Sequence, residues 1–178
     1  MDNVGKLIFK RLEFIVQRLK QKNNKNLYAL DLGCGDGYWS KKLQEFGFIV
    51  DAVDKNKDIL NNLKNNKNIN IYCTDVLNFK FPKKYYDVVI CLNLLHLLNE
   101  NNRTFIIKKI YNTTKFGGTA FLLFKQNINN PILISDFWIF DIIFCKNFFL
   151  NNEWYIFLEL KKPKFSHKLK KIIEFFLK

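Results

Sequence analysis

The chain has 178 residues, of which 48% are hydrophobic, and 29 Lys and Arg against 16 Asp and Glu give it a net charge of +13. This length predicts one domain with an ordinary core, and this apolar content excludes disorder over the whole chain. The most apolar stretch, 131–150, contains Asp136, Asp141 and Lys146, and the charged N-terminus lacks a secretory signal pattern. We therefore expect no membrane insertion and a cytoplasmic protein.

The apolar residues predict helices and strands that alternate from the N-terminus onward. Residues 4–22 carry an apolar stripe at helical spacing. Short apolar runs that end at turns follow, which is typical of buried parallel strands. Such alternation predicts βαβ units and a largely parallel sheet with helices on both faces. The predicted strands are 27–33, 48–54, 69–74, 86–92 and 119–124, and the predicted helices are 4–22, 38–46, 57–66 and 100–114.

The C-terminal third is less regular. Residues 136–150 are predicted to form an aromatic-rich helix, and residues 153–160 a strand. The last segment, 168–178, fits either a helical stripe or a buried strand, and periodicity alone does not separate the two. The aromatic segment 137–149 is also a candidate surface for a protein partner.

The positive charge has two interpretations. Lys, Asn, Ile and Phe are all frequent, which is the joint excess that an AT-rich genome imposes through its codons, and the lysines lie along most of the chain. We therefore favour an evenly solvated basic surface over a nucleic-acid footprint. The charge still leaves RNA open as a partner.

Metal binding is not expected from the cysteines. Cys34, Cys73, Cys91 and Cys145 are scattered, no pair has CxxC spacing, and the chain has only two His. This arrangement argues against a zinc site and favours free thiols in a reducing compartment.

The most informative motif is the segment 30–37, with the sequence LDLGCGDG. It is a strand that ends in three alternating glycines before a helix, and glycines there let the backbone turn sharply and let a ligand approach the peptide plane. The helix start favours a polar or anionic ligand group. Asp54 ends the next strand, where a carboxylate can accept both hydroxyls of a ribose. Together these features predict a nucleoside-containing ligand at the carboxyl ends of the strands.

The glycine pattern distinguishes two ligand classes. The dinucleotide fingerprint GxGxxG would need a third glycine at position 38, where Tyr38 stands. The segment DLGCGDG instead resembles motif I of the class I S-adenosylmethionine-dependent methyltransferases. The segments VDAVDKN, CTDV, YDVVICLNLLHLL and KFGGTAFLLF resemble further motifs of that family in the same order, so the resemblance covers about residues 27–124. Within the family, it is nearest to the small tellurite-resistance and thiopurine-type methyltransferases.

This resemblance implies an α/β fold: a Rossmann-like, doubly wound, mostly parallel seven-stranded sheet with an antiparallel edge strand and helices on both faces. Residues 153–160 and 170–178 then become strands six and seven, and we predict this strand pair in preference to a terminal helix. The chain is expected to be one methyltransferase domain over 1–178. It would consist of the N-terminal helix 4–22, a cofactor-binding core at 27–126 and an acceptor-side segment at 127–178.

The cofactor that the resemblance implies is S-adenosylmethionine, with S-adenosylhomocysteine as the product. The family motif assigns backbone contacts with the methionine part to Gly33, Cys34 and Gly35. Asp31 is expected to pair with the ammonium group of the cofactor. Asp54 is expected to bind the ribose hydroxyls, and its structural alternative is a cap for the helix at 57.

The remaining assignments follow the later motifs. Lys55 is expected to flank the adenine, Asp75 to accept from the adenine amino group, and the Val76 N–H to reach a ring nitrogen. An ordinary loop acid is the alternative for Asp75. Leu92 and Asn93, just past the fourth strand, are expected to close over the amine and the sulfonium.

The acceptor is less constrained by the sequence. His96 lies past the fourth strand and could act as a general base, but a packed histidine that only shapes the pocket is the favoured interpretation. We expect a small-molecule acceptor, with a soft chalcogen or thiol as the finer hypothesis, because such acceptors need little deprotonation. The alternatives are RNA methylation and a non-catalytic, methyltransferase-like partner subunit.

Overall fold

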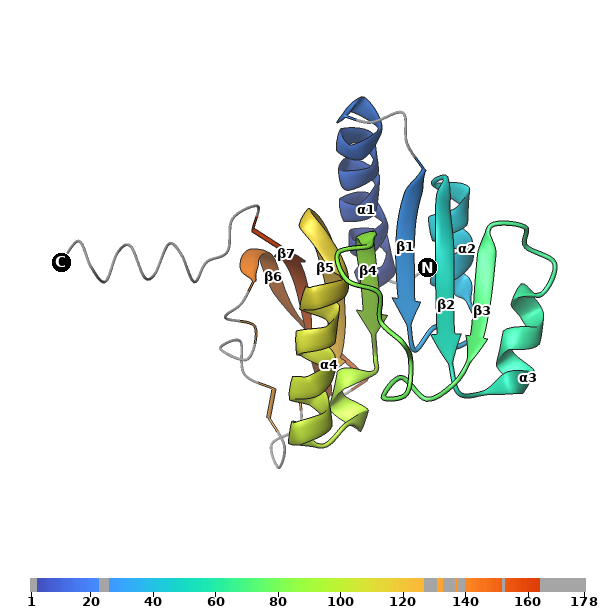
Figure 1. Ribbon diagram of the computed structural model, residues 1–178. Coiled ribbons are helices and arrows are strands. Elements are labelled where there is room, and N and C mark those ends of the chain that lie inside the picture. Colours follow the sequence, from blue (N-terminus) through green and yellow to red (C-terminus); the bar gives the residue numbers. More distant parts are fainter. Residues whose placement is uncertain are drawn as a thin grey trace.

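The computed structural model describes residues 3–22, 26–126, 131–132, 137, 140–151 and 153–163. Within these ranges the strands form a seven-stranded sheet in the order β3-β2-β1-β4-β5-β7-β6 (Figure 1). Strands β1 to β5 are parallel, and β7 runs antiparallel to both of its neighbours. The elements are α1 (Asn3–Lys22), β1 (Leu27–Leu32), α2 (Tyr38–Glu45), β2 (Phe48–Asp54), α3 (Lys57–Leu60), η1 (Asn61–Leu63), β3 (Ile69–Cys73), β4 (Tyr86–Leu92), η2 (Leu95–Leu97), α4 (Glu100–Thr113), β5 (Thr114–Lys125), β6 (Asp141–Leu150) and β7 (Glu153–Lys161).

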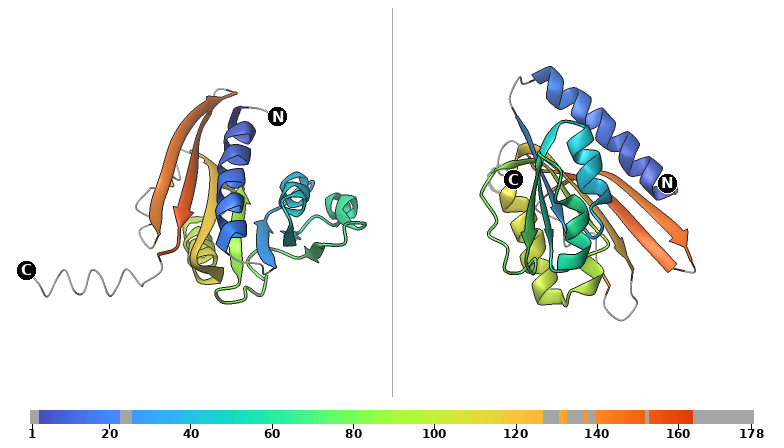
Figure 2. Two further views of the ribbon diagram at one scale, coloured as in Figure 1. Left: turned by 90° about the horizontal axis from the view of Figure 1, so that it is seen from above. Right: turned by 90° about the vertical axis from the view of Figure 1, so that its right-hand side faces the viewer.

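The sheet is covered on both faces, as the sequence predicted. Successive side chains of a strand point to opposite faces, so each buried strand contributes to two apolar clusters. Along β2, Val50 and Ala52 pack in the cluster that contains the apolar stripe of α1, whereas Val53 packs in the cluster that contains α4. Figure 2 shows α1, α2 and α3 on one side of the sheet and α4 on the other. No helix in the described ranges is long and apolar enough to cross a membrane.

The predicted elements of the parallel half are confirmed, with small shifts at their ends. The helix predicted at 57–66 is shorter and continues as the 3-10 helix η1, and the fifth strand begins at Thr114 instead of 119. The seven-stranded mixed sheet with an antiparallel pair at one edge is also confirmed.

The helix predicted at 136–150 is wrong, because residues 141–150 form the edge strand β6. The segment is rich in Ile and Phe, which favour strands as much as an apolar helix face, and its pairing with β7 over the length of both strands decides the outcome. The antiparallel pair therefore consists of β6 and β7, not of residues 153–160 and 170–178. The predicted strand at 170–178 lies outside the described residues.

An ion pair fastens α1 to the antiparallel strands. The Arg11 Nε lies 2.5 Å from the Oε2 of Glu159, whose residue is only 4% exposed. The Arg11 guanidinium also lies 4.7 Å from the ring centre of Phe144 on β6. Because Glu159 is buried, its carboxylate depends on this partner.

Replacing this arginine tests that dependence. We expect Arg11→Met to lower the free energy of unfolding by about 3 kcal/mol, because it leaves a buried carboxylate without its partner. The matched control is Lys42→Met, which removes the solvent-facing pair with Glu45 and is expected to unfold at the same urea concentration as the parent protein. Urea unfolding followed by circular dichroism measures both. Equal midpoints for the two variants would contradict the argument.

Candidate functional site

The three glycines after β1 form a bend that needs glycine. Gly33, Gly35 and Gly37 have φ angles of 74°, 53° and 75°, which lie in the left-handed region that side chains with a Cβ disfavour. The N–H groups of Gly33 and Cys34 both donate to the carbonyl of Val53, at 2.8 and 3.0 Å. The bend is therefore held against the end of β2.

Asp54, the last residue of β2, also holds the bend. Its Oδ2 accepts from the Gly35 N–H at 3.0 Å, and its Oδ1 accepts from the Asn56 N–H at 2.9 Å. The helix cap at α3 belongs instead to Asn56, whose side chain accepts from two N–H groups of the first turn. The carboxylate therefore lies at the glycine bend, and the alternative in which it caps α3 is not what the structure has.

Asp31 is a buried carboxyl at the carboxyl end of β1. It is 3% exposed, and its Oδ2 accepts from the Ser40 hydroxyl on α2 at 2.6 Å. Burial raises the pKa of Asp31 to about 7, against the hydrogen bonds from Ser40, which lower it. The side chain thus changes charge near neutral pH, which makes it sensitive to a nearby cation.

Cys34 lies next to this carboxyl and is inert. Burial raises the pKa of its thiol, and the carboxylates of Asp31 and Asp54 raise it further. A thiol that stays protonated is a poor nucleophile. Cys34 therefore serves as a small residue within the bend.

A pocket of about 410 Å³ opens beside the bend. It brings together six of the residues that the sequence assigned to the cofactor, from β1, the bend and the end of β4. The N-terminal part of α1 forms another wall, which the sequence did not predict. The lining residues are Val4, Gly5, Ile8, Asp31, Gly33, Cys34, Gly35, Trp39, Leu92, Asn93 and Leu123.

Asn93 closes the end of β4 with a turn of its own. Its φ is 58°, and its N–H donates to the carbonyl of Leu123 on β5 at 2.7 Å. This turn directs the chain away from the sheet directly after Leu92. Both residues thereby reach the wall of the pocket.

The other assigned residues do not line this pocket and lie at the ends of the neighbouring strands. Lys55 follows β2 and is exposed, and Asp75 and the buried Val76 follow β3. The two strand ends are joined, because the Thr74 N–H donates to the Asp54 carbonyl at 3.0 Å. Asp75 Oδ1 accepts from the Leu77 N–H at 2.9 Å, so one of its oxygens already stabilises its own loop.

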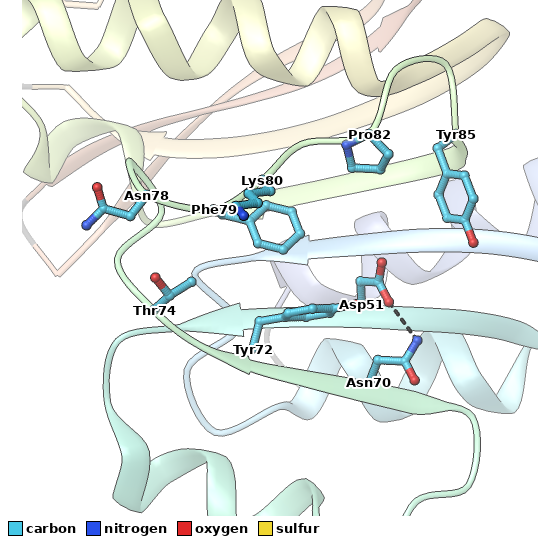
Figure 3. A pocket seen from close by; sticks show the side chains of 9 residues that line it. All are labelled: Asp51, Asn70, Tyr72, Thr74, Asn78, Phe79, Lys80, Pro82 and Tyr85. Atoms are coloured by element: carbon cyan, nitrogen blue, oxygen red, sulfur yellow. Dashed lines mark hydrogen bonds between the residues drawn. The ribbon is translucent and has the colours of Figure 1, made fainter.

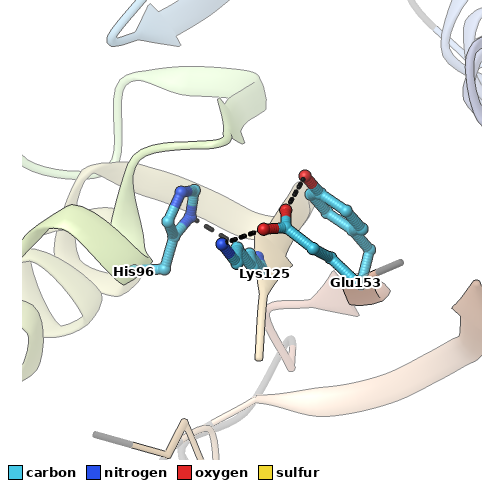
Figure 4. Close-up of polar contacts among 4 residues, drawn as sticks. His96, Lys125 and Glu153 are labelled. Atoms are coloured by element: carbon cyan, nitrogen blue, oxygen red, sulfur yellow. Dashed lines mark hydrogen bonds and ion pairs between the residues drawn. The ribbon is translucent and has the colours of Figure 1, made fainter. Parts of the chain in front are cut away.

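His96 lies in a polar cluster with the end of β5 and the start of β7 (Figure 4). Its Nδ1 accepts from the backbone N–H of Lys125 at 3.4 Å. The Lys125 ammonium pairs with Glu153, whose other oxygen accepts from the Tyr155 hydroxyl at 3.1 Å. Burial and Lys125 lower the pKa of His96, whereas Glu153 raises it. His96 is therefore neutral near pH 7 and, with Nδ1 accepting, carries its proton on Nε2.

Two functional contributions were not predicted from the sequence. The first is the hydrogen bond from Ser40 to Asp31. No feature of the sequence indicates that a serine on a helix bonds to a particular residue of a strand. The second is the pocket wall formed by Val4 and Ile8. Both residues belong to the apolar stripe of the predicted helix, but an apolar stripe does not indicate which of its residues line a pocket.

Within the described residues, no group of three or more His, Cys, Asp or Glu could hold a metal ion.

Comparison with known proteins identifies the family of the chain. A family model described as "Methyltransferase domain" matches residues 29–118, about half of the chain. The Ubiquinone biosynthesis O-methyltransferase of Rickettsia bellii is 31% identical over 107 residues, which cover 56% of this chain and 44% of that protein. The chain thus spans less than half the length of the first curated relatives that it matches.

Solved structures share the fold over most of the chain. The N-methyltransferase NodS from Bradyrhizobium japonicum, in complex with S-adenosyl-L-homocysteine, has a TM-score of 0.68 at 15% identity and covers 87% of this chain and 88% of its own. TehB from Haemophilus influenzae has a TM-score of 0.66 at 20% identity, and the match covers 85% of this chain and 62% of TehB. The residues matched by the family model, 29–118, include the glycine bend, Asp54 and Asp75. The chain therefore belongs to the methyltransferase domain family.

Proposed function

We propose that the chain is an S-adenosylmethionine-dependent methyltransferase that acts on a small molecule. The observation that carries the proposal is the pocket at the glycine bend, where the buried carboxyl of Asp31 and the open backbone of Gly35 lie together. Family membership supports it, as do relatives whose names include N- and O-methyltransferases.

The residues present fit the cofactor. A Cβ built on Gly35 meets nothing within 4 Å, so the backbone there faces open space that a ligand can fill. Asp31 supplies a carboxylate for an ammonium group, and Leu92 and Asn93 line the same pocket. Asp54 lies at the same bend and can accept from the ribose hydroxyls with oxygen lone pairs that its two N–H partners leave unused.

The adenine end is proposed to lie over the ends of β2 and β3. Lys55 would flank the base, Asp75 would accept from its amino group with Oδ2, and the Val76 N–H would reach a ring nitrogen. The bond between Thr74 and Asp54 supports this assignment, because it holds the two strand ends in one surface.

The bound cofactor supplies a methyl group on a positively charged sulfur, which is already an excellent leaving group. The chain's own contribution is then to orient that sulfur and to exclude water. Asp31 fixes the ammonium end, and the buried side chains of Val4 and Ile8 close the pocket from the side of α1. Leu92 and Asn93 line the same pocket and would limit the space from which an acceptor reaches the bound cofactor.

For the acceptor we propose a soft chalcogen or a thiol. Oxygen and ring-nitrogen acceptors usually need a base, and His96 is poorly suited to that role because its Nδ1 already accepts from Lys125. The sequence resemblance to the tellurite-resistance methyltransferases points the same way. RNA as the acceptor, suggested by the net charge, and a non-catalytic partner role are the competing proposals.

Gly35→Ala tests the binding of the cofactor. The new Cβ has room in the protein but would enter the space of the ligand, so we expect at least tenfold weaker binding of S-adenosylhomocysteine by calorimetry. Gly47→Ala is the matched control, because Gly47 also has a positive φ of 93° and lies outside the pocket. Both variants carry a backbone strain of about 1 kcal/mol. Equal affinities for the two variants would refute the proposed position of the cofactor.

Asp31 predicts a pH dependence of that binding. A ligand ammonium favours the charged carboxylate, so the affinity for S-adenosylhomocysteine should rise about tenfold between pH 6 and pH 8 if the pKa is about 7 in the free protein. Asp31→Asn should remove this dependence. An affinity of the parent protein that is flat over the same range would contradict the pairing.

The same group affects stability in the opposite direction. The folded protein holds the proton of Asp31 more tightly than the unfolded chain, because the pKa is raised from 3.8 to about 7 on folding. This contribution to the free energy of unfolding is therefore fully present below pH 3.8 and is lost as the pH rises through about 7. Urea unfolding of the parent and Asp31→Asn proteins at pH 5 and pH 8 measures this difference. The parent should lose more stability than the variant over that interval.

A pH–rate profile tests the acceptor proposal. With a radiolabelled methyl donor and a series of thiols, we expect the rate to rise through the pKa of each thiol and to shift with it. His96→Asn should leave the profile unchanged, because the amide oxygen can still accept from the Lys125 N–H. A step below pH 6.5 that disappears in His96→Asn would identify His96 as a base. Labelling of RNA without labelling of thiols or selenols would overturn the small-molecule proposal.

A further inference from the structure

A second pocket, of about 450 Å³, lies between β2, β3 and the segment that leads from β3 to β4 (Figure 3). It shares no lining residue with the pocket at the glycine bend. It opens on the other face of the sheet, because Asp51 on β2 alternates with Val50 and Ala52, which pack beneath α1. Its lining residues are Asp51, Asn70, Tyr72, Thr74, Asn78, Phe79, Lys80, Pro82 and Tyr85.

The floor of this pocket holds a buried carboxylate without a cationic partner. Asp51 is 8% exposed, and its two oxygens accept from the Asn70 amide at 2.8 Å and from the Tyr86 hydroxyl at 2.5 Å. Burial and Asp51 itself raise the pKa of Tyr86, so the tyrosine stays protonated and donates. Within the described residues, none of the ion pairs involves Asp51. Neutral donors therefore solvate this negative charge, and a buried charge gains most from an opposite charge.

The walls around this carboxylate are aromatic. The rings of Tyr72 and Phe79 lie 5.2 Å apart at 71° and form a corner. Figure 3 shows Tyr85 on the far side of Asp51 from Thr74, and the aromatic rings and the carboxylate border the same space. Tyr72 and Tyr85 are 39% and 38% exposed, so their rings remain available to a ligand.

We propose that this pocket is a binding site for a small organic cation of the substituted ammonium class. An ammonium with alkyl groups gains from the faces of aromatic rings and from a carboxylate at short range. A metal ion is disfavoured because one carboxylate among aromatic walls is a poor set of oxygen ligands. An anionic ligand is disfavoured by the charge of Asp51, despite Lys80 at the rim.

The test uses choline and its uncharged carbon analogue, 3,3-dimethyl-1-butanol, with the full-length protein saturated with S-adenosylhomocysteine. That saturation fills the pocket at the glycine bend, and calorimetry or ligand-observed NMR measures the binding of each probe. We expect choline to bind at least tenfold more tightly than the alcohol. Equal binding of the two probes, or no choline binding up to about 10 mM, would overturn the proposal.

Two variants and one control variant separate the contributions of the carboxylate and of the nearby lysine. Asp51→Asn should weaken choline binding at least tenfold. Lys80→Ala should strengthen choline binding about twofold or more, because it removes a competing positive charge from the rim. Lys108→Ala removes the same charge from the exposed side of α4 and should leave binding unchanged.

The two lysine variants keep the test decisive if Asp51→Asn fails to fold, since both side chains are exposed. Weaker binding of choline to Lys80→Ala than to Lys108→Ala would refute a cation site. Tighter binding of a phosphate-bearing nucleotide than of choline, lost in Lys80→Ala, would assign the pocket to an anion instead. Neither outcome bears on the proposed methyl transfer, which depends on the other pocket.

Discussion

The attachment of the glycine bend to the end of β2 is the constraint on which the rest of the site depends. Two backbone N–H groups of the bend share the carbonyl of Val53, and a third reaches the carboxylate of Asp54. These bonds fix where α2 begins relative to the sheet. The first turns of α2 in turn bring Ser40 to Asp31. One local turn thus sets both the opening of the pocket and the charge of the carboxyl within it.

Packing on the two faces of the sheet determines what surrounds that bend. On one face, α1 lies over the parallel strands and is fastened by Arg11 to Glu159 on β7. Its N-terminal residues Val4 and Ile8 therefore become a wall of the pocket. On the other face, residues 74–85 between β3 and β4 form no helix, and part of the sheet stays open over Asp51. The same sheet thus presents a pocket on each face, of different chemistry.

The sequence predicted the parallel half of the fold well, because each strand there is a short apolar run bounded by its own turn. It failed at 136–150, where Ile and Phe occur at spacings that a helix or a strand can use. The deciding contact is the register of β6 against β7, from Leu150 opposite Glu153 back to Asp141 opposite Lys161. A pairing of that length stabilises the strand more than local preference favours either structure. The sequence of 136–150 alone does not indicate which segment it pairs with.

From the sequence alone, the turn after β1 was predictable, since left-handed φ angles such as those at 33, 35 and 37 favour glycine. The sequence also predicted that Asp54 ends the adjacent strand. The sequence could not predict that Asp31 is buried enough to titrate near neutral pH, nor that the Nδ1 of His96 accepts from the backbone N–H of Lys125. Burial and hydrogen-bond partners depend on residues distant in the chain, and the free energy of a charge depends on both.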